Sequence, residues 1–112
     1  MTEKTSYISY DKLVRDRIPE IIKNANKTPE CRTLAEDREY LAYLIKKLQE
    51  EVLEFVEDPC VEELADVREV VKALSSIRAF EDVESVQKKK REQRGGFEER
   101  ILLTGVFEKE ME

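Results

Sequence analysis

Two amphipathic segments joined by an Asp-Pro pair constrain the fold of this chain most strongly. Hydrophobic residues recur at helical spacing over residues 36–57, which predicts one long amphipathic helix. They are Leu41, Leu44, Ile45, Leu48, Val52 and Phe55. Asp58 and Pro59 interrupt this pattern, because Asp is a good N-cap and Pro is tolerated at the first position of a helix. A second helix is therefore predicted over residues 59–77, and the short turn makes the two helices antiparallel neighbours.

Shorter elements are predicted on either side of this helix pair. Residues 18–26 predict a short helix with a proline in its first turn, and residues 80–94 predict a third amphipathic helix that Gly95-Gly96 ends. Residues 100–107 have the β-branched and aromatic character of a strand, with residues 30–34 as a candidate partner.

The expected fold is therefore mainly α, an antiparallel helical bundle with two long acidic helices and a short strand pair. A chain of 112 residues is expected to form a single domain over residues 1–112.

Charge and composition exclude several functional classes. A net charge of −6 argues against binding to a nucleic acid polymer, which needs an excess of basic surface. No apolar run approaches the ~20 residues of a membrane span, and the first residues lack a hydrophobic signal core, so a cytoplasmic protein is expected. Cys31 and Cys60 are expected to be two reduced packing thiols. Since the sequence has no histidine, any metal must be held mainly by oxygen.

Four acidic residues lie where a helical wheel directs them toward the interface of the two long helices. Glu51 lies about 60° from the centre of the apolar stripe of the first helix, and Glu54 about 120° from it. In the second helix Glu63 falls inside the apolar arc, and Asp66 lies about 20° beyond its edge. An ionised carboxylate inside an apolar face is costly unless it is paired or coordinated, so Glu63 in particular calls for a partner.

The spacing of the four acids predicts a shared cation. Glu51 and Glu54 are spaced i, i+3, as are Glu63 and Asp66, so each pair lies on one side of its helix. Two carboxylates ~4 Å apart repel by about 4 kcal/mol at an effective dielectric of 20, which a bound cation would offset. Oxygen ligands favour Mg²⁺, with Mn²⁺ as the alternative. The other interpretation is that these acids form surface salt bridges with residues such as Lys46, Lys47 and Arg68.

The acidic motifs also resemble those of a known superfamily. The sequences EEVLE at 50–54 and ELAD at 63–66 match the form EExxE followed by ExxD. This resembles the all-α nucleoside-triphosphate pyrophosphohydrolases, which include the MazG-like enzymes and phosphoribosyl-ATP pyrophosphohydrolase. Two further segments, YDKLVRDRIPEII at 10–22 and KKKREQRGGFEERILL at 88–103, are similar to a small stand-alone branch of that superfamily.

The resemblance implies Mg²⁺-dependent hydrolysis of the α–β phosphoanhydride of a nucleotide, with release of pyrophosphate. Matched position by position, it implies Glu51, Glu54, Glu63 and Asp66 as metal ligands. Glu50 matches the first acid of the motif, and it is the candidate catalytic group that supports a ligand or activates water. The segment between the two motifs, residues 55–62, is shorter than in most members, which leaves the substrate open.

Basic residues are still needed for phosphates that the metal does not hold. The inner face of the predicted third helix continues into Lys90 and Arg94, which are candidate phosphate contacts, as is Arg15. The alternatives are that Lys90 and Arg94 complement the helix dipole, and that Arg15 pairs with an acid.

Three functional hypotheses and one assembly follow. The first function is a nucleotide pyrophosphohydrolase; the others are a phosphoribosyl-ATP step of histidine synthesis and a non-catalytic helical interaction protein. A homodimer or homotetramer is expected, because helices of this length leave apolar surface to cover.

Overall fold

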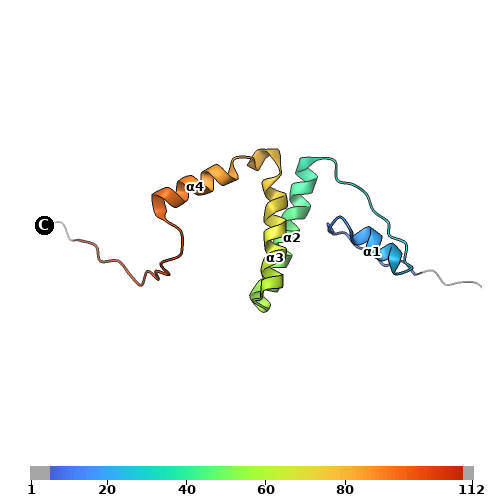
Figure 1. Ribbon diagram of the computed structural model, residues 1–112, viewed down its shortest axis with the longest axis horizontal. Coiled ribbons are helices and arrows are strands. Elements are labelled where there is room, and N and C mark those ends of the chain that lie inside the picture. The colour runs from blue at the N-terminus through green and yellow to red at the C-terminus, as the bar shows by residue number, and fades with distance from the viewer. Residues whose placement is uncertain (1–5, 110–112) are drawn as a thin grey trace, which may run out of the picture. The chain divides into compact units, whose positions relative to one another are not determined.

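The computed structural model describes residues 6–109 and confirms a mainly α fold (Figure 1). In chain order its helices are α1 (Ile18–Asn24), α2 (Asp37–Glu57), α3 (Val61–Ser75), the 3₁₀ helix η1 (Arg78–Phe80) and α4 (Val83–Arg94). The chain divides into two compact units between Glu81 and Asp82, and each unit is described by itself. A larger bundle around α2 and α3, and the single domain, remain predictions.

The α2–α3 hairpin is the central feature of the first unit. The two helices run side by side in opposite directions, as their spacing in the sequence predicts (Figure 1). The prediction that Asp58 caps the second helix is wrong, because Asp58 closes α2 instead, its backbone N–H donating to the Glu54 carbonyl at 3.0 Å. The residue before a proline is disfavoured in helical conformation, so Asp58 leaves the helix. Cys60, in extended conformation, is the N-cap of α3.

The ends of the other helices also differ slightly from the predicted ones. The second long helix stops at Ser75 rather than at residue 77. At this end the Ser75 hydroxyl donates to the Val71 carbonyl, and the Ser76 hydroxyl donates to the Ala73 carbonyl. Serine side chains compete in this way with the helical hydrogen bonds of the backbone. α1 ends two residues early, and Asn26 adopts a left-handed φ of 62°, which asparagine tolerates.

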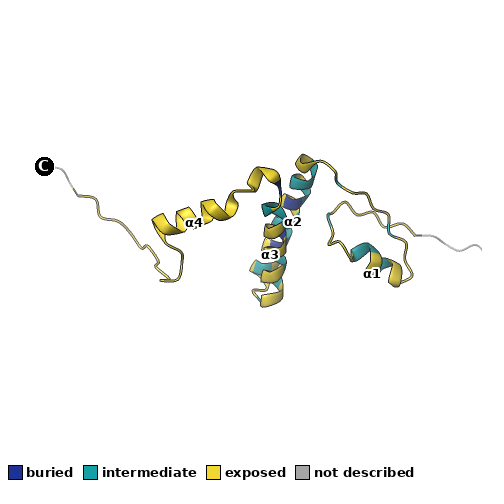
Figure 2. Ribbon diagram, turned by 45° about the horizontal axis from the view of Figure 1, so that its top comes forward, coloured by how far each residue is buried: buried dark blue, intermediate teal, exposed yellow. Residues whose placement is uncertain are grey.

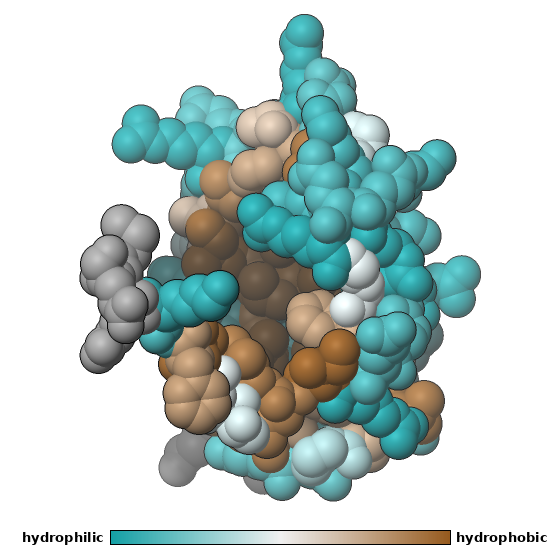
Figure 3. All heavy atoms as spheres, turned by 90° about the vertical axis from the view of Figure 1, so that its left-hand side faces the viewer, coloured by the Kyte–Doolittle hydropathy of each residue, from teal (hydrophilic) through white to brown (hydrophobic). Residues whose placement is uncertain are grey.

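A small core holds the hairpin together. Leu44 of α2, Val70 of α3 and Ile77 are buried, with exposed fractions of 2%, 7% and 4% (Figure 2). The half-buried residues packed against them are Leu13, Tyr40, Leu41, Leu48, Ala73 and Leu74. Other members of the predicted apolar stripes are exposed, and hydrophobic side chains are visible at the surface beside hydrophilic ones (Figure 3). The two helices therefore bury only part of their apolar surface against each other.

The second unit contains α4 and the segment after it. α4 begins at Val83, later than the predicted residue 80, because residues 78–80 form a 3₁₀ turn that belongs to the first unit. Gly95 ends α4 at a φ of 81°, as predicted, a conformation that glycine adopts without a steric penalty. Arg91 donates to Glu98 at 2.6 Å, and this hydrogen bond lowers the pKa of the Glu98 carboxyl.

The predicted strand pair is wrong. Neither residues 30–34 nor residues 100–107 form a strand, and no strand occurs anywhere within residues 6–109. The apolar side chains of the second segment are exposed, for example Ile101 at 80% and Leu102 at 84%. Strand propensity is a preference for a pleated, half-buried surface, so without such a surface it does not produce a strand.

None of the helices in the part of the chain that the structure describes has the length and apolar character of a membrane span.

Candidate metal centre

The α2–α3 hairpin brings three of the four predicted metal ligands together. Glu51 from α2 and Glu63 and Asp66 from α3 each offer a carboxylate oxygen, and the three oxygens lie within 4.8 Å of one another. The group forms because Glu51 lies near the end of α2 and Glu63 near the start of α3, so the short turn sets them across from each other. Here these three residues are called the carboxylate group.

The carboxylate group contains buried acidic side-chain atoms, which are uncommon in proteins unless they are paired. Glu51 has an exposed fraction of 7%, which makes it a buried charged residue among residues 6–109. The Oε2 atoms of Glu51 and Glu63 are buried and have no hydrogen-bond partner within those residues. A buried carboxylate oxygen without a partner carries a desolvation penalty of about 1–3 kcal/mol or more. Carboxylate oxygens without a protein partner are the donors that a hard divalent cation would satisfy.

Lys47 partly compensates the charge of the carboxylate group. Its Nζ lies 3.0 Å from Glu51 Oε1 and 3.8 Å from Glu50 Oε1. The predicted salt bridge to these acids is therefore formed by Lys47. Neither Lys46 nor Arg68 forms an ion pair with a residue in the described range 6–109. Because Lys47 engages only one oxygen of Glu51, the second oxygen stays free for a ligand.

Glu54, the fourth predicted ligand, lies beside the carboxylate group rather than in it. Its side chain is exposed. Repulsion from the Glu51 carboxylate is the main cause that raises the pKa of Glu54 above its ordinary value, and Glu63 and Glu50 contribute in the same direction. Negative charge is therefore crowded at this end of the hairpin, which is the electrostatic condition for binding a cation.

Two further predicted residues are placed next to the carboxylate group. Arg15 Nη2 donates to Asp66 Oδ1 at 2.5 Å, so Arg15 pairs with an acid, which was the alternative to a phosphate contact. Glu50 is half-buried and pairs with Lys12 at 3.5 Å as well as with Lys47. Its catalytic role remains a prediction, since it lies outside the three converging carboxylates.

Lys90 and Arg94 are exposed residues of α4 in the second unit. Their contact with phosphate remains a prediction.

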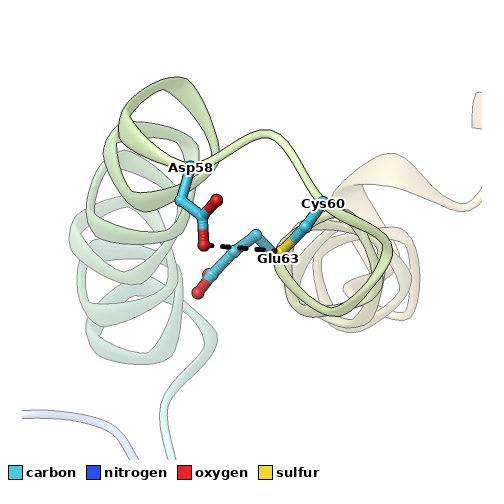
Figure 4. A group of neighbouring side chains, drawn as sticks. All are labelled: Asp58, Cys60 and Glu63. Atoms are coloured by element: carbon cyan, nitrogen blue, oxygen red, sulfur yellow. Dashed lines mark hydrogen bonds between the residues drawn. The ribbon is translucent and has the colours of Figure 1, made fainter.

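A second set of metal-ligating side chains shares Glu63 with the first. Asp58, Cys60 and Glu63 also offer ligand atoms within 4.8 Å of one another. Cys60 Sγ lies 3.8 Å from Asp58 Oδ2, and Glu63 extends from α3 toward α2 (Figure 4). Sequence reasoning had given Asp58 a capping role and Cys60 a packing role. The i, i+3 spacing of Cys60 and Glu63 was the signal that could have linked them. Cys31 and Cys60 are both free cysteines, but Cys31 is exposed, so its predicted packing role is wrong.

Sequence reasoning also missed a hollow beside the carboxylate group. It has a volume of about 190 Å³. Its polar lining consists of Asp11, Lys12, Tyr43, Lys46, Lys47 and Glu50, and we call it the lysine hollow. The Tyr43 hydroxyl donates to Asp11 at 2.6 Å, and this hydrogen bond raises the pKa of Tyr43. Lys12 in the loop segment and Lys46-Lys47 on α2 are 34 residues or more apart in the sequence, so only the fold brings them together.

Comparison with known proteins gives one partial match. No family model matches the chain, and no solved structure does. A protein of Mycolicibacterium smegmatis described as uncharacterized is 60% identical over 42 residues, which are 38% of this chain and 42% of that protein. The match thus spans about two fifths of the relative's length. This chain is similar to that protein over the matched segment.

Proposed function

We propose that this chain is a Mg²⁺-dependent nucleotide pyrophosphohydrolase. It would cleave the α–β phosphoanhydride of a nucleoside triphosphate or a related nucleotide, giving a monophosphate and pyrophosphate. One observation carries the proposal: Glu51, Glu63 and Asp66 converge, and two of their oxygens are buried without a partner. The resemblance of EEVLE and ELAD to the motifs of the all-α pyrophosphohydrolases supports it.

The ligand set fits a hard divalent ion. Glu51, Glu63 and Asp66 would hold Mg²⁺, or Mn²⁺ as the alternative, and Glu54 adds negative charge beside them. Such an ion supplies Lewis-acid chemistry, because it lowers the pKa of a bound water and offsets charge on phosphoryl oxygens. Arg15 orients the Asp66 carboxylate through their ion pair, and Lys47 orients that of Glu51.

The reaction itself needs no nucleophile from the protein. A water oxygen forms the new bond to the α-phosphorus, the bond from that phosphorus to the α–β bridging oxygen breaks, and the electron pair leaves with pyrophosphate. The proton of the water passes to Glu50 and then to solvent. Glu50 pairs with Lys12 at 3.5 Å and with Lys47, which also contacts Glu51, so its carboxylate is near enough to the carboxylate group to be the candidate acceptor of that proton.

Pyrophosphate release tests this proposal. Full-length protein is incubated with nucleoside triphosphates and with phosphoribosyl-ATP, with and without Mg²⁺, and pyrophosphate is measured. Release should require Mg²⁺ and should fall about 100-fold or more in Glu63→Gln and Asp66→Asn, the scale found when one preorganised electrostatic contact is removed.

The matched control is Glu62→Gln, which removes the same charge from an exposed position on α3. Release from phosphoribosyl-ATP alone would favour a step in histidine synthesis. Activity that survives in Glu63→Gln and Asp66→Asn would refute the assignment of the site, and no activity on any nucleotide would favour the interaction protein.

We further propose that the chain assembles as a homodimer or homotetramer. Several apolar residues of the hairpin are exposed, among them Val52 at 42%, Val56 at 66% and Val71 at 47%. Removal of such surface from water contributes about 25 cal/mol per Å², and this contribution opposes the entropy lost on association.

Sedimentation velocity at several protein concentrations should therefore show a species larger than the 13.2 kDa chain. Val56→Glu should shift it toward monomer, whereas Gln49→Glu, the same new charge at an exposed polar position of α2, should not. A monomer at every concentration would contradict this proposal.

A further inference from the structure

We infer that the lysine hollow is the binding site for the terminal phosphates of the nucleotide, which leave as pyrophosphate. This inference rests on the proposed function and adds to it the residues that recognise the leaving group. They are Lys12, Lys46 and Lys47, none of which was a candidate phosphate contact in the sequence.

The lysine hollow gathers three ammonium groups, and two of them, those of Lys12 and Lys46, have no ion pair shorter than 3.5 Å among the residues that the structure describes. Three ammonium groups line it against two carboxylates, in a chain whose net charge is −6. Asp11 is engaged by the Tyr43 hydroxyl, and Glu50 is shared by Lys12 at 3.5 Å and Lys47 at 3.8 Å. Both distances exceed the ~2.7–2.9 Å of a good charge-assisted hydrogen bond. Lys12 therefore retains capacity to donate to another anion, whereas Lys47 also contacts Glu51 at 3.0 Å.

Lys46 is the residue most available to a ligand. Its ammonium lies 5.2 Å from the centre of the Tyr43 ring, and it pairs with no acid among the residues that the structure describes. A lysine contacts phosphate as a compact point charge with three donors. In the lysine hollow it can therefore turn toward a phosphate without giving up an ion pair.

The position of the lysine hollow suits a chain of phosphates that begins at the carboxylate group. Lys47 belongs to both sites, because it lines the hollow while its Nζ contacts Glu51. A polyphosphate near Glu51, Glu63 and Asp66 would be repelled by their carboxylates, and adjacent ammonium groups reduce that repulsion. Cleavage at the α-phosphorus would then leave pyrophosphate on the lysines.

Volume indicates which part of the nucleotide the lysine hollow accepts. At about 190 Å³ it is smaller than the ~300–1,000 Å³ of pockets that enclose drug-sized ligands. One or two phosphates match that space, whereas a base and a sugar would lie outside it. The expected ligand is therefore pyrophosphate or the β- and γ-phosphates, and the lysine hollow should not discriminate between bases.

Calorimetric titration with inorganic pyrophosphate tests this inference. The full chain is titrated in the presence of a chelator, so that binding does not depend on a divalent ion. Lys46→Met and Lys12→Met should each bind pyrophosphate about tenfold more weakly than the wild type, the equivalent of one charge-assisted contact. Lys46→Arg, which keeps the charge, should stay within about threefold of the wild type.

Lys72→Met is the matched control, since Lys72 is an exposed lysine of α3 that does not line the lysine hollow. Its affinity for pyrophosphate should equal that of the wild type. Equal weakening in the control and in Lys46→Met would show a general effect of net charge and overturn the inference. No binding of pyrophosphate by the wild type would overturn it as well.

A parallel titration with Mn²⁺ separates this inference from the proposed function. Glu63→Gln should lose Mn²⁺ binding and keep its affinity for pyrophosphate in chelator. If the wild type does not bind Mn²⁺ but Lys46→Met lowers the affinity for pyrophosphate, the proposed function fails and the lysine hollow remains an anion-binding site. If Mn²⁺ binding and turnover are normal while Lys46→Met and Lys12→Met behave like Lys72→Met, the inference alone fails.

Discussion

Mn²⁺ or Mg²⁺ should raise the melting temperature of the wild-type protein, and Glu51→Gln should abolish that rise. An ion that binds only the folded chain stabilises it by about 2.7 kcal/mol at 100 times its dissociation constant. For a domain of this size that corresponds to roughly 10 °C or more in Tm. Glu51 is the residue to change, because its Oε2 is buried without a partner. It is also the residue that α2 contributes to the carboxylate group, beside Glu63 and Asp66 of α3. Calorimetry with increasing metal concentration measures the effect.

The control for this experiment is Glu57→Gln. Glu57 is an exposed acid on the same helix, so its replacement removes the same charge without touching the carboxylate group. It should show the full stabilisation by metal. A loss of the metal effect in both variants would point to a diffuse electrostatic attraction rather than a site, and a full effect in Glu51→Gln would exclude Glu51 as a ligand.

Leu44→Ala should lower the free energy of unfolding by about 2–5 kcal/mol, the range measured for such truncations in cores. Leu44 has an exposed fraction of 2% and packs with Val70 and Ile77 between the two long helices. Domains have a total stability of only ~5–15 kcal/mol, and this core has few fully buried residues. The substitution should therefore leave a protein close to unfolding at 37 °C.

Urea denaturation at one fixed protein concentration measures this loss. The control is Leu53→Ala, which makes the same chemical change on α2 at a position that is 58% exposed. It should cost well under about 1 kcal/mol, because a surface position has little packing to lose. Equal costs at the two positions would mean that the α2–α3 contact is not the main source of stability.

Some features of the hairpin follow from local geometry and were therefore predictable. The helical repeat of apolar residues defines α2 and α3, since 3.6 residues per turn converts spacing into direction. The same repeat directs Glu51, Glu63 and Asp66 to one interface, and the structure brings these three together. The helical wheel places Glu54 about 60° further than Glu51 from the centre of the apolar stripe. In the structure Glu54 lies beside the carboxylate group, and its side chain is exposed.

Other features depend on contacts between distant segments, and local patterns mispredicted or missed them. Residues 100–107 have strand propensity, but their apolar side chains are exposed and no strand pairs with them in the described range 6–109. The partner of Arg15 was open in the sequence, and the structure shows that it contacts Asp66, 51 residues away, whereas its contact with phosphate stays a prediction.

The sequence by itself determined the two long helices, their antiparallel turn and the inward direction of the acids, because each depends on residues within one or two turns. Only the tertiary structure decided which acid is buried, which lysine pairs with it and where a hollow remains. Burial is a property of surfaces in contact, so the exposed fraction of Glu51 and the meeting of Lys12 with Lys46 and Lys47 exist only after the chain has folded.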